Sequence, residues 1–208
     1  MTQFKAAFLN ELTRIFRKRK TVVFCIIDII IIVSHVLLGK IPGSVGFALS
    51  SVGSLLNLHG LFFWLIFPLY IFMETMDVFA GEMSNLSIRN VLIRPVTRTK
   101  IYLAKACAVC AFILAQILFV GIFGAIFSGI MGDGALTVVR NIAAFIITFI
   151  PMIAFVFMAS CVSQIVKNGL VGMLLCIFFL LVAYVLEALA PTISAFLFVR
   201  HVNMYKMV

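Results

Sequence analysis

Long apolar runs, separated by short polar or glycine- and proline-containing stretches, dominate the chain. About 20 mostly apolar residues suffice for an α-helix to cross the hydrocarbon core of a bilayer. Runs of about that length cover residues 21–38, 55–73, 102–130, 138–163 and 170–190. The pattern predicts an all-α polytopic membrane protein with five transmembrane helices, forming one transmembrane domain over residues 1–208.

The segment at residues 3–20 comes before the first run and has a different pattern. Its charged residues surround a narrow helical stripe of Phe4, Phe8, Leu12, Ile15 and Phe16. Because the basic run at 17–20 leads straight into the apolar segment, we expect an amphipathic helix in the membrane interface. The alternative is an amphipathic helix packed on protein.

The distribution of charge predicts the orientation. The chain is 64% hydrophobic, only 11% charged, and carries a net charge of +9. With five spans, 12 of the 16 lysines and arginines fall on the side of the N-terminus and of the 74–100 loop. Basic residues collect on the cytoplasmic side of membrane proteins, so we expect a cytoplasmic N-terminus. The same bias accounts for the net charge without a nucleic-acid partner. The tail at 191–208 is expected on the extracellular side or as a re-entrant segment.

Proline and small residues give two expectations about helix shape and packing. Pro151 lies near the middle of the fourth run and is expected to kink it, because proline removes one helical hydrogen bond. Small residues at four-residue spacing allow helix backbones to approach closely. The third run has two such series, formed by Gly121, Ala125 and Gly129 and by Gly124 and Ser128.

The chain lacks motifs for catalysis, metal binding or nucleotide binding. The only Gly-Lys pair, Gly39-Lys40, has no phosphate-binding loop around it, and there is no H-E-x-x-H or G-x-S-x-G. The five cysteines all lie in apolar stretches. We therefore expect no catalytic, cofactor-binding or metal-binding residues on this chain, and no enzyme activity.

Asp28 is a candidate functional residue because it lies in the middle of the first run, flanked by isoleucines. An ionisable side chain inside a membrane is costly and marks a functional site by default. His35 follows two helical turns later on the same face. The two residues either line a polar substrate path or make polar contacts with a neighbouring helix.

The 74–100 loop carries a recognisable series of residues. It reads Asp77-Val-Phe-Ala-Gly-Glu82, then, after an apolar stretch, Arg94-Pro95-Val-Thr-Arg98, with Lys105 in the next run. This series resembles the type-2 ABC transporter permease family. In that family an Ala-Gly-Glu-like step, an apolar helix, a Pro-Val-Ser/Thr-Arg run and a lysine follow one another between the second and third spans. The interfacial helix at 3–20 resembles the family's connecting helix.

The resemblance implies a permease subunit of an ATP-driven exporter in a bacterial plasma membrane. The loop would form a coupling helix seated on a separate ABC ATPase subunit, present in two copies, which would bind the ATP and Mg. A second permease subunit, identical or homologous, would complete the transporter, and the cargo would be a peptide, a lipid or another amphipathic molecule. The residues implied in ATPase coupling are Glu82, Arg89, Arg94, Pro95 and Arg98. The family usually has six spans where five are predicted here, and Arg89 stands where the family often has an acid.

Two other functions fit the same pattern. A non-transporting membrane component for immunity or sensing in a peptide-export system would keep the helical bundle without needing an ATPase. A membrane enzyme acting on lipids would need clustered polar groups at one depth, for which Asp28 and His35 are the only candidates.

Overall fold

The computed structural model describes residues 2–39, 60–84, 97–131, 135–166 and 168–189, and these are almost entirely helical, without a strand. The described helices are α1 (Thr2–Phe16), α2 (Arg19–Gly39), the π-helix η1 (Phe62–Ile66), α5 (Phe67–Ser84), α7 (Arg98–Met131), α8 (Ala135–Ile147), α9 (Phe149–Ile165) and α10 (Gly169–Leu189). The predicted all-α class is confirmed for this part of the chain. The expected connection after the first span and the tail at 191–208 lie outside the described residues.

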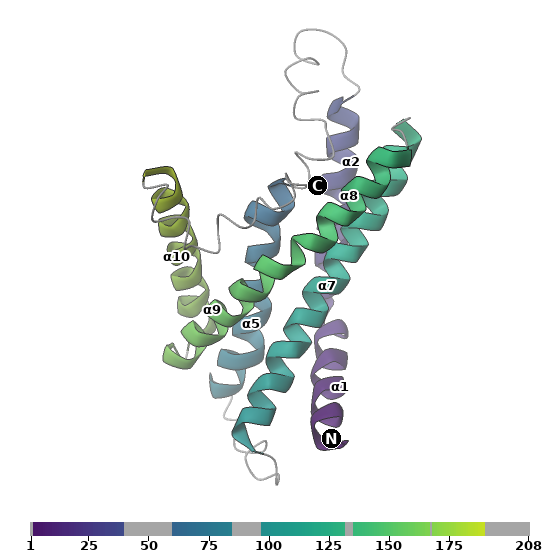
Figure 1. Ribbon diagram of the computed structural model, residues 1–208. Coiled ribbons are helices and arrows are strands. Elements are labelled where there is room, and N and C mark those ends of the chain that lie inside the picture. Colours follow the sequence, from purple (N-terminus) through teal and green to yellow (C-terminus); the bar gives the residue numbers. More distant parts are fainter. Residues whose placement is uncertain (1, 40–59, 85–96, 132–134, 167, 190–208) are drawn as a thin grey trace.

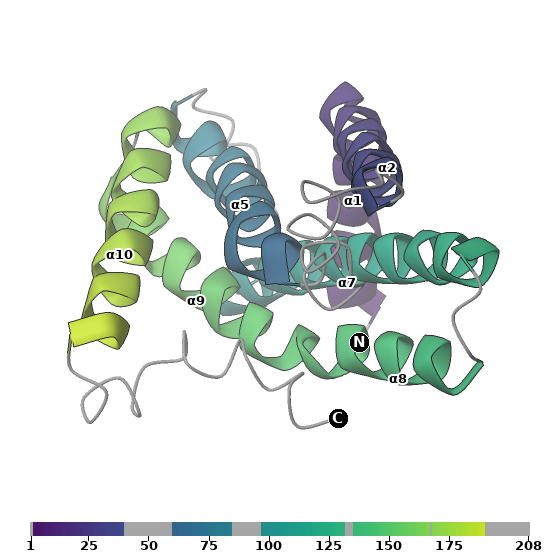
Figure 2. The same cartoon turned by 90° about the horizontal axis from the view of Figure 1, so that it is seen from above.

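The longest helix, α7, is the central element of the bundle. It contacts α1, α2, α5, α8 and α9, while α5 packs on α9 and α10 as well (Figures 1 and 2). Aromatic side chains fill much of the core between these helices, and the largest fully buried ones include Phe62, Phe67, Phe72, Phe112 and Phe155. The arrangement leaves α2 and α10 on opposite sides of α5 when the bundle is viewed from above (Figure 2).

Within the described residues, four helical stretches are long and apolar enough to cross a membrane: Phe62–Gly81, Thr99–Phe127, Ile142–Ile165 and Gly169–Glu187. They correspond to the second to fifth predicted spans. The first predicted span coincides with α2, which is not one of the four, so its crossing stays a prediction.

The second span ends later than the sequence pattern predicts. We expected a loop from residue 74, but α5 continues without a break to Ser84. The acidic residues Glu74 and Asp77 suggested a membrane boundary, yet each has a lysine partner in the fold. Because those partners offset the charge, the helix passes through both positions, and only the later part of the expected 74–100 loop separates α5 from α7.

The fourth span is bent, as Pro151 predicts. The helix is interrupted at Thr148, between α8 and α9, and Figure 2 shows the change in direction. Proline has no N–H to donate and its ring clashes with the carbonyl four residues earlier, which here belongs to Ile147. Thr148 stabilises the bend, because both its backbone N–H and its hydroxyl donate to the carbonyl of Ala144, at 3.1 and 2.7 Å.

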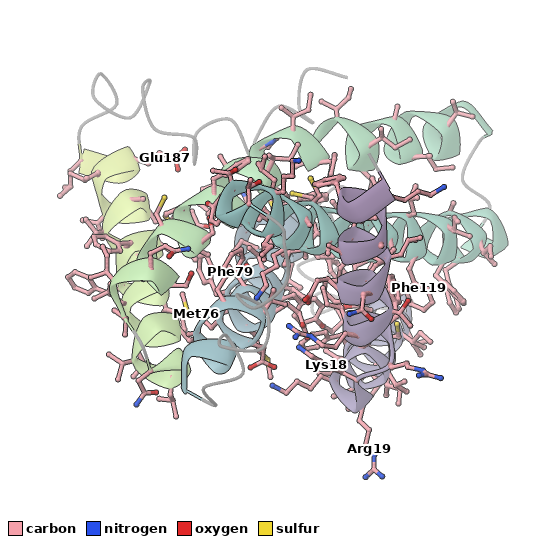
Figure 3. The ribbon with its side chains drawn as sticks, turned by 90° about the horizontal axis from the view of Figure 1, so that it is seen from below. Lys18, Arg19, Met76, Phe79, Phe119 and Glu187 are labelled. Atoms are coloured by element: carbon pink, nitrogen blue, oxygen red, sulfur yellow. The ribbon has the colours of Figure 1, made fainter. Side chains whose placement is uncertain are left out.

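The N-terminal helix is shorter than expected and packs on protein. Helix α1 ends at Phe16, and a turn at Arg17 and Lys18 separates it from α2. It lies across α7 (Figure 3), and Ile15 of its apolar stripe is fully buried. This packing is what the protein-packed alternative expects, although Phe16 remains 43% exposed. A position in the membrane interface stays a prediction.

The small residues of α7 are only partly used for close packing. A Cβ added at Gly121 would lie 3.7 Å from Phe145 of α8, an ordinary contact distance, so α8 packs against this position of α7. Nothing lies within 4 Å of a Cβ added at Gly129, so the predicted stripe does not extend to that position in the described bundle. Gly124 is buried and Ala125 half-buried, while the side chain of Ser128 lies outside the described residues.

Candidate functional site

Four charged side chains join the start of α2 to α5. Lys18 Nζ lies 3.0 Å from Glu74 Oε2 and 3.5 Å from Asp77 Oδ2, and Lys20 Nζ lies 2.6 Å from the same Asp77 oxygen. We call these four residues the basic–acidic cluster. The sequence predicts all four on the cytoplasmic side, and the fold brings them together where α1 is followed by α2.

Burial differs across the basic–acidic cluster, and this sets the strength of its contacts. The side chain of Glu74 has no exposed surface, and that of Lys18 is 23% exposed. Lys20 and Asp77 are 42% and 35% exposed. Exposed ion pairs contribute little because water screens them, whereas a buried carboxylate depends on its partner. The Lys18–Glu74 pair is therefore the structural link, and the Lys20–Asp77 pair adds less.

Next to this cluster, the ends of α5 and α7 are fixed to each other. The buried Lys105 of α7 donates a hydrogen bond of 3.1 Å from Nζ to the carbonyl of Val78, and its ammonium lies over the ring of Phe79. Phe79 also packs on Tyr102, at 5.4 Å between ring centroids. The Tyr102 and Ser160 hydroxyls form a 2.7 Å hydrogen bond that extends the network to α9. These contacts thus join α5, α7 and α9 to one another.

A second polar contact between α2 and α5 lies inside the bundle. Asp28 has no exposed surface, and its Oδ1 accepts a 3.0 Å hydrogen bond from the Tyr70 hydroxyl. Its other oxygen, Oδ2, is buried without a hydrogen-bond partner. The ring of Phe24 stacks on Tyr70 at 4.1 Å. The contact holds α2 to α5 at Tyr70, which lies one helical turn before Glu74 on α5.

Asp28 faces inward because of its position on α2. The buried residues of this helix recur at helical spacing, at Thr21, Phe24, Asp28 and Ile32. The outward face carries six exposed valines and isoleucines: Val22, Val23, Ile26, Ile27, Ile29 and Ile30. The acid therefore belongs to the helix interface and does not face the apolar surroundings.

The structure describes the predicted coupling residues only in part. Glu82 belongs to the last turn of α5 and Arg98 begins α7, but their side chains lie outside the described residues. Arg89, Arg94 and Pro95 lie outside them altogether. Their role in ATPase coupling stays a prediction.

Of the two predicted intramembrane polar residues, only Asp28 has a described side chain. It meets Tyr70, which agrees with the interhelical alternative, while the side chain of His35 on α2 lies outside the described residues.

Sequence reasoning missed the partners in both polar contacts. Lys18 and Glu74 are separated by 56 residues, and nothing local indicates that they meet. One signal was present: Glu74 and Asp77 are three residues apart, so on one helix they share a face that could receive a pair of cations. Tyr70 carries no such signal within its apolar run.

The described residues contain no group of three or more His, Cys, Asp or Glu side chains placed to hold a metal ion. All five cysteines are free thiols.

Fold and polar contacts together define the class: a multi-pass membrane protein, helical throughout its described part, in which ion pairs join the start of α2 to α5. The chain belongs to a family described as a protein of unknown function (DUF2705), which matches residues 21–208. No curated protein and no solved structure matches it.

Proposed function

We propose that this protein is the permease subunit of an ATP-driven ABC exporter in a bacterial plasma membrane, with the loop between the second and third spans, within residues 74–100, seated on a separate ATPase. The proposal rests on the series from Asp77 to Arg98, which resembles the type-2 permease family. Two permease subunits and two ATPase subunits would form the transporter. A peptide, a lipid or another amphipathic molecule is the proposed cargo.

The observation that carries the proposal is the bond from Lys105 Nζ to the Val78 carbonyl, at 3.1 Å. Lys105 is the lysine that the resemblance marks at the entrance of the third span. Its bond joins the two helices that flank the proposed coupling segment. A push on that segment would then move α5 and α7 as a unit, which is what a coupling element requires.

The basic–acidic cluster gives the motion a further path. Because Lys18 binds the buried Glu74 at 3.0 Å, a displacement of α5 is passed to the start of α2. Energy from ATP binding shifts a permease only through contacts that differ between its two states. The ion pairs between α2 and α5 are contacts of that kind, since they can break and re-form as α2 moves.

Affinity purification from native membranes tests the proposal. The chain, extracted in mild detergent, is expected to bring down an ABC ATPase in stoichiometric amount, and Arg94→Ala is expected to weaken or abolish this association. Arg19→Ala is the matched control, because Arg19 points away from the bundle (Figure 3). Recovery of the chain alone, in good yield, would favour the non-transporting immunity or sensing component.

Lys105→Met separates coupling from assembly. The substitution keeps the apolar stem and removes the bond to Val78, so the ATPase is expected to bind but to lose its regulation by the permease. The measured quantity is the ATPase rate in the complex divided by the rate of the free ATPase. Coupling free energies of typical size correspond to roughly 5- to 150-fold effects, and we expect this ratio to fall by a factor in that range. An unchanged ratio in a folded Lys105→Met complex would contradict the role of this bond.

A further inference from the structure

The buried carboxyl of Asp28 has an unusual set of neighbours. Its Oδ1 accepts from the Tyr70 hydroxyl at 3.0 Å, while Oδ2 is buried and has no hydrogen-bond partner among the described residues. The ion pairs of the described residues do not include Asp28. One neutral donor does not offset a full negative charge removed from water, and a group in this situation takes up a proton instead.

We infer that Asp28 is a proton-binding site inside the bundle and that its bound proton keeps α2 against α5. The proton adds to Oδ2 and converts the carboxylate into a neutral carboxylic acid. Oδ1 then remains the acceptor for Tyr70, in agreement with the observed geometry. The inference is independent of the proposed transport function.

The charged groups around Asp28 are already engaged elsewhere. Lys20 lies eight residues earlier on α2, about 12 Å along the helix axis, and binds Asp77. On α5, Glu74 lies one turn beyond Tyr70 and binds Lys18. Within the described part of the chain, Asp28 is therefore left without a counter-charge.

The side of the site formed by α7 is neutral. Gln116 approaches the thiol of Cys25, with 3.9 Å between Oε1 and the sulfur, and Phe112 lies beside Phe24. Lys105 lies about three turns before Gln116 on α7 and binds the carbonyl of Val78. On α2 itself the remaining titratable neighbours are the Cys25 thiol and His35, whose side chain lies outside the described residues.

A metal ion fits this site less well than a proton. Ca²⁺ and Mg²⁺ require six or more oxygen ligands, and no cluster of three acidic, histidine or cysteine side chains exists among the described residues. Oδ2 is also closed to solvent. A proton needs only the one free oxygen.

Loss of the proton would weaken the contact between α2 and α5. The two helices meet through the basic–acidic cluster and the Asp28–Tyr70 bond, whereas α2 packs more extensively on α7. A charge on Asp28 would favour a position of α2 in which water reaches the carboxylate. The proton is thereby linked to the separation of α2 from α5.

Infrared spectroscopy of the purified protein in lipid nanodiscs tests the site, with the spectrum of each variant subtracted from that of the wild type. At neutral pH the wild type is expected to show the carbonyl band of a buried carboxylic acid, and the band should disappear in Asp28→Asn. Asp77→Asn is the matched control and should keep the band, because Asp77 belongs to the basic–acidic cluster, where it pairs with Lys20. In Tyr70→Phe the band should shift to higher frequency, since the hydrogen bond to the carbonyl oxygen is lost.

A wild-type spectrum without this band, or a band that survives in Asp28→Asn, would overturn the inference. If Asp28→Asn fails to fold, the shift in Tyr70→Phe still decides, because an unshifted band cannot come from Asp28.

Spin labels at the exposed positions Ile30 and Leu65 test whether the bound proton keeps α2 against α5. Their separation should increase in alkaline buffer in the wild type and stay constant in Asp28→Asn, and a separation that does not depend on pH in the wild type would contradict the link.

Discussion

Replacing Lys18 by alanine is expected to lower the free energy of unfolding by about 3–5 kcal/mol, the typical cost of removing one partner of a buried ion pair. The substitution leaves Glu74 with no exposed surface and without its cation. One of its oxygens, Oε1, already has no hydrogen-bond partner. The remaining lysine, Lys20, is bound to Asp77.

Two companion substitutions show whether burial causes this loss. Lys20→Ala removes the same charge from a pair whose members are 42% and 35% exposed, so we expect a loss of about 0–1 kcal/mol. The double variant Lys18→Ala/Glu74→Ala removes both members of the buried pair. It should lose less than the sum of the single variants, because no buried charge is left alone.

Thermal unfolding in one mild detergent, measured side by side for the wild type, Lys18→Ala, Glu74→Ala, Lys20→Ala and the double variant, checks these expectations. Equal midpoints for Lys18→Ala and Lys20→Ala would show that the pair is not buried in solution as it is in the structure. Additive losses in the double variant would show that Lys18 and Glu74 do not interact.

The apolar pattern predicted most of the helices correctly because each apolar run ends at a strong local signal. The third and fifth runs begin near basic or glycine residues and end near glycine or proline, and α7 and α10 differ from them by a few residues. The bend of the fourth run follows from one residue, Pro151. Local sequence is sufficient in these cases because the cause of the boundary is local.

The second span shows where local reasoning fails. Glu74 and Asp77 resemble a membrane boundary when they are read with their neighbours alone. Their charges are offset by Lys18 and Lys20, which precede them by 56 and 57 residues. A contact between distant parts of the chain cannot be inferred from one sequence, so the extension of α5 to Ser84 was not predicted.

The candidate site was predicted in part for the same reason. Asp28 stands out because an acid within an apolar run is costly wherever it lies. Its partner Tyr70 is one of several aromatic residues in an apolar run, and only the fold selects it. The coupling residues rest on a resemblance over residues 77–105, of which 85–96 lie outside the described structure, so their role depends on the affinity-purification experiment.

The contact between α10 and α5 depends on a glycine that the sequence analysis did not select. A Cβ added at Gly172 would lie 2.6 Å from Met76 Sδ and 3.2 Å from its Cε. One turn earlier, a Cβ at Gly169 would lie 3.9 Å from the Cβ of Met76. Figure 3 shows Met76 between the two helices. Because lipid is as apolar as these side chains, such helices associate mainly through close packing.

Gly172→Ala is therefore expected to destabilise the protein by about 1–3 kcal/mol, the usual cost of overpacking a core. Met76 is only 2% exposed, so its side chain cannot move aside without displacing a neighbour. Gly129→Ala is the matched control, because nothing lies within 4 Å of the added methyl. Glycine is a poor helix former, so this control should be neutral or stabilising by up to about 1 kcal/mol.

Thermal unfolding in detergent separates the two glycines, and a second substitution identifies the atom responsible. Met76→Ala creates a cavity by itself, but combined with Gly172→Ala it removes the sulfur that the new methyl would strike. The double variant should be more stable than the sum of the two single losses predicts. If Gly172→Ala behaves like Gly129→Ala, then α10 does not seat on α5 through Met76. In that case its contact with the bundle would rest mainly on α9 and on the stacking of Tyr184 against Trp64, at 4.8 Å.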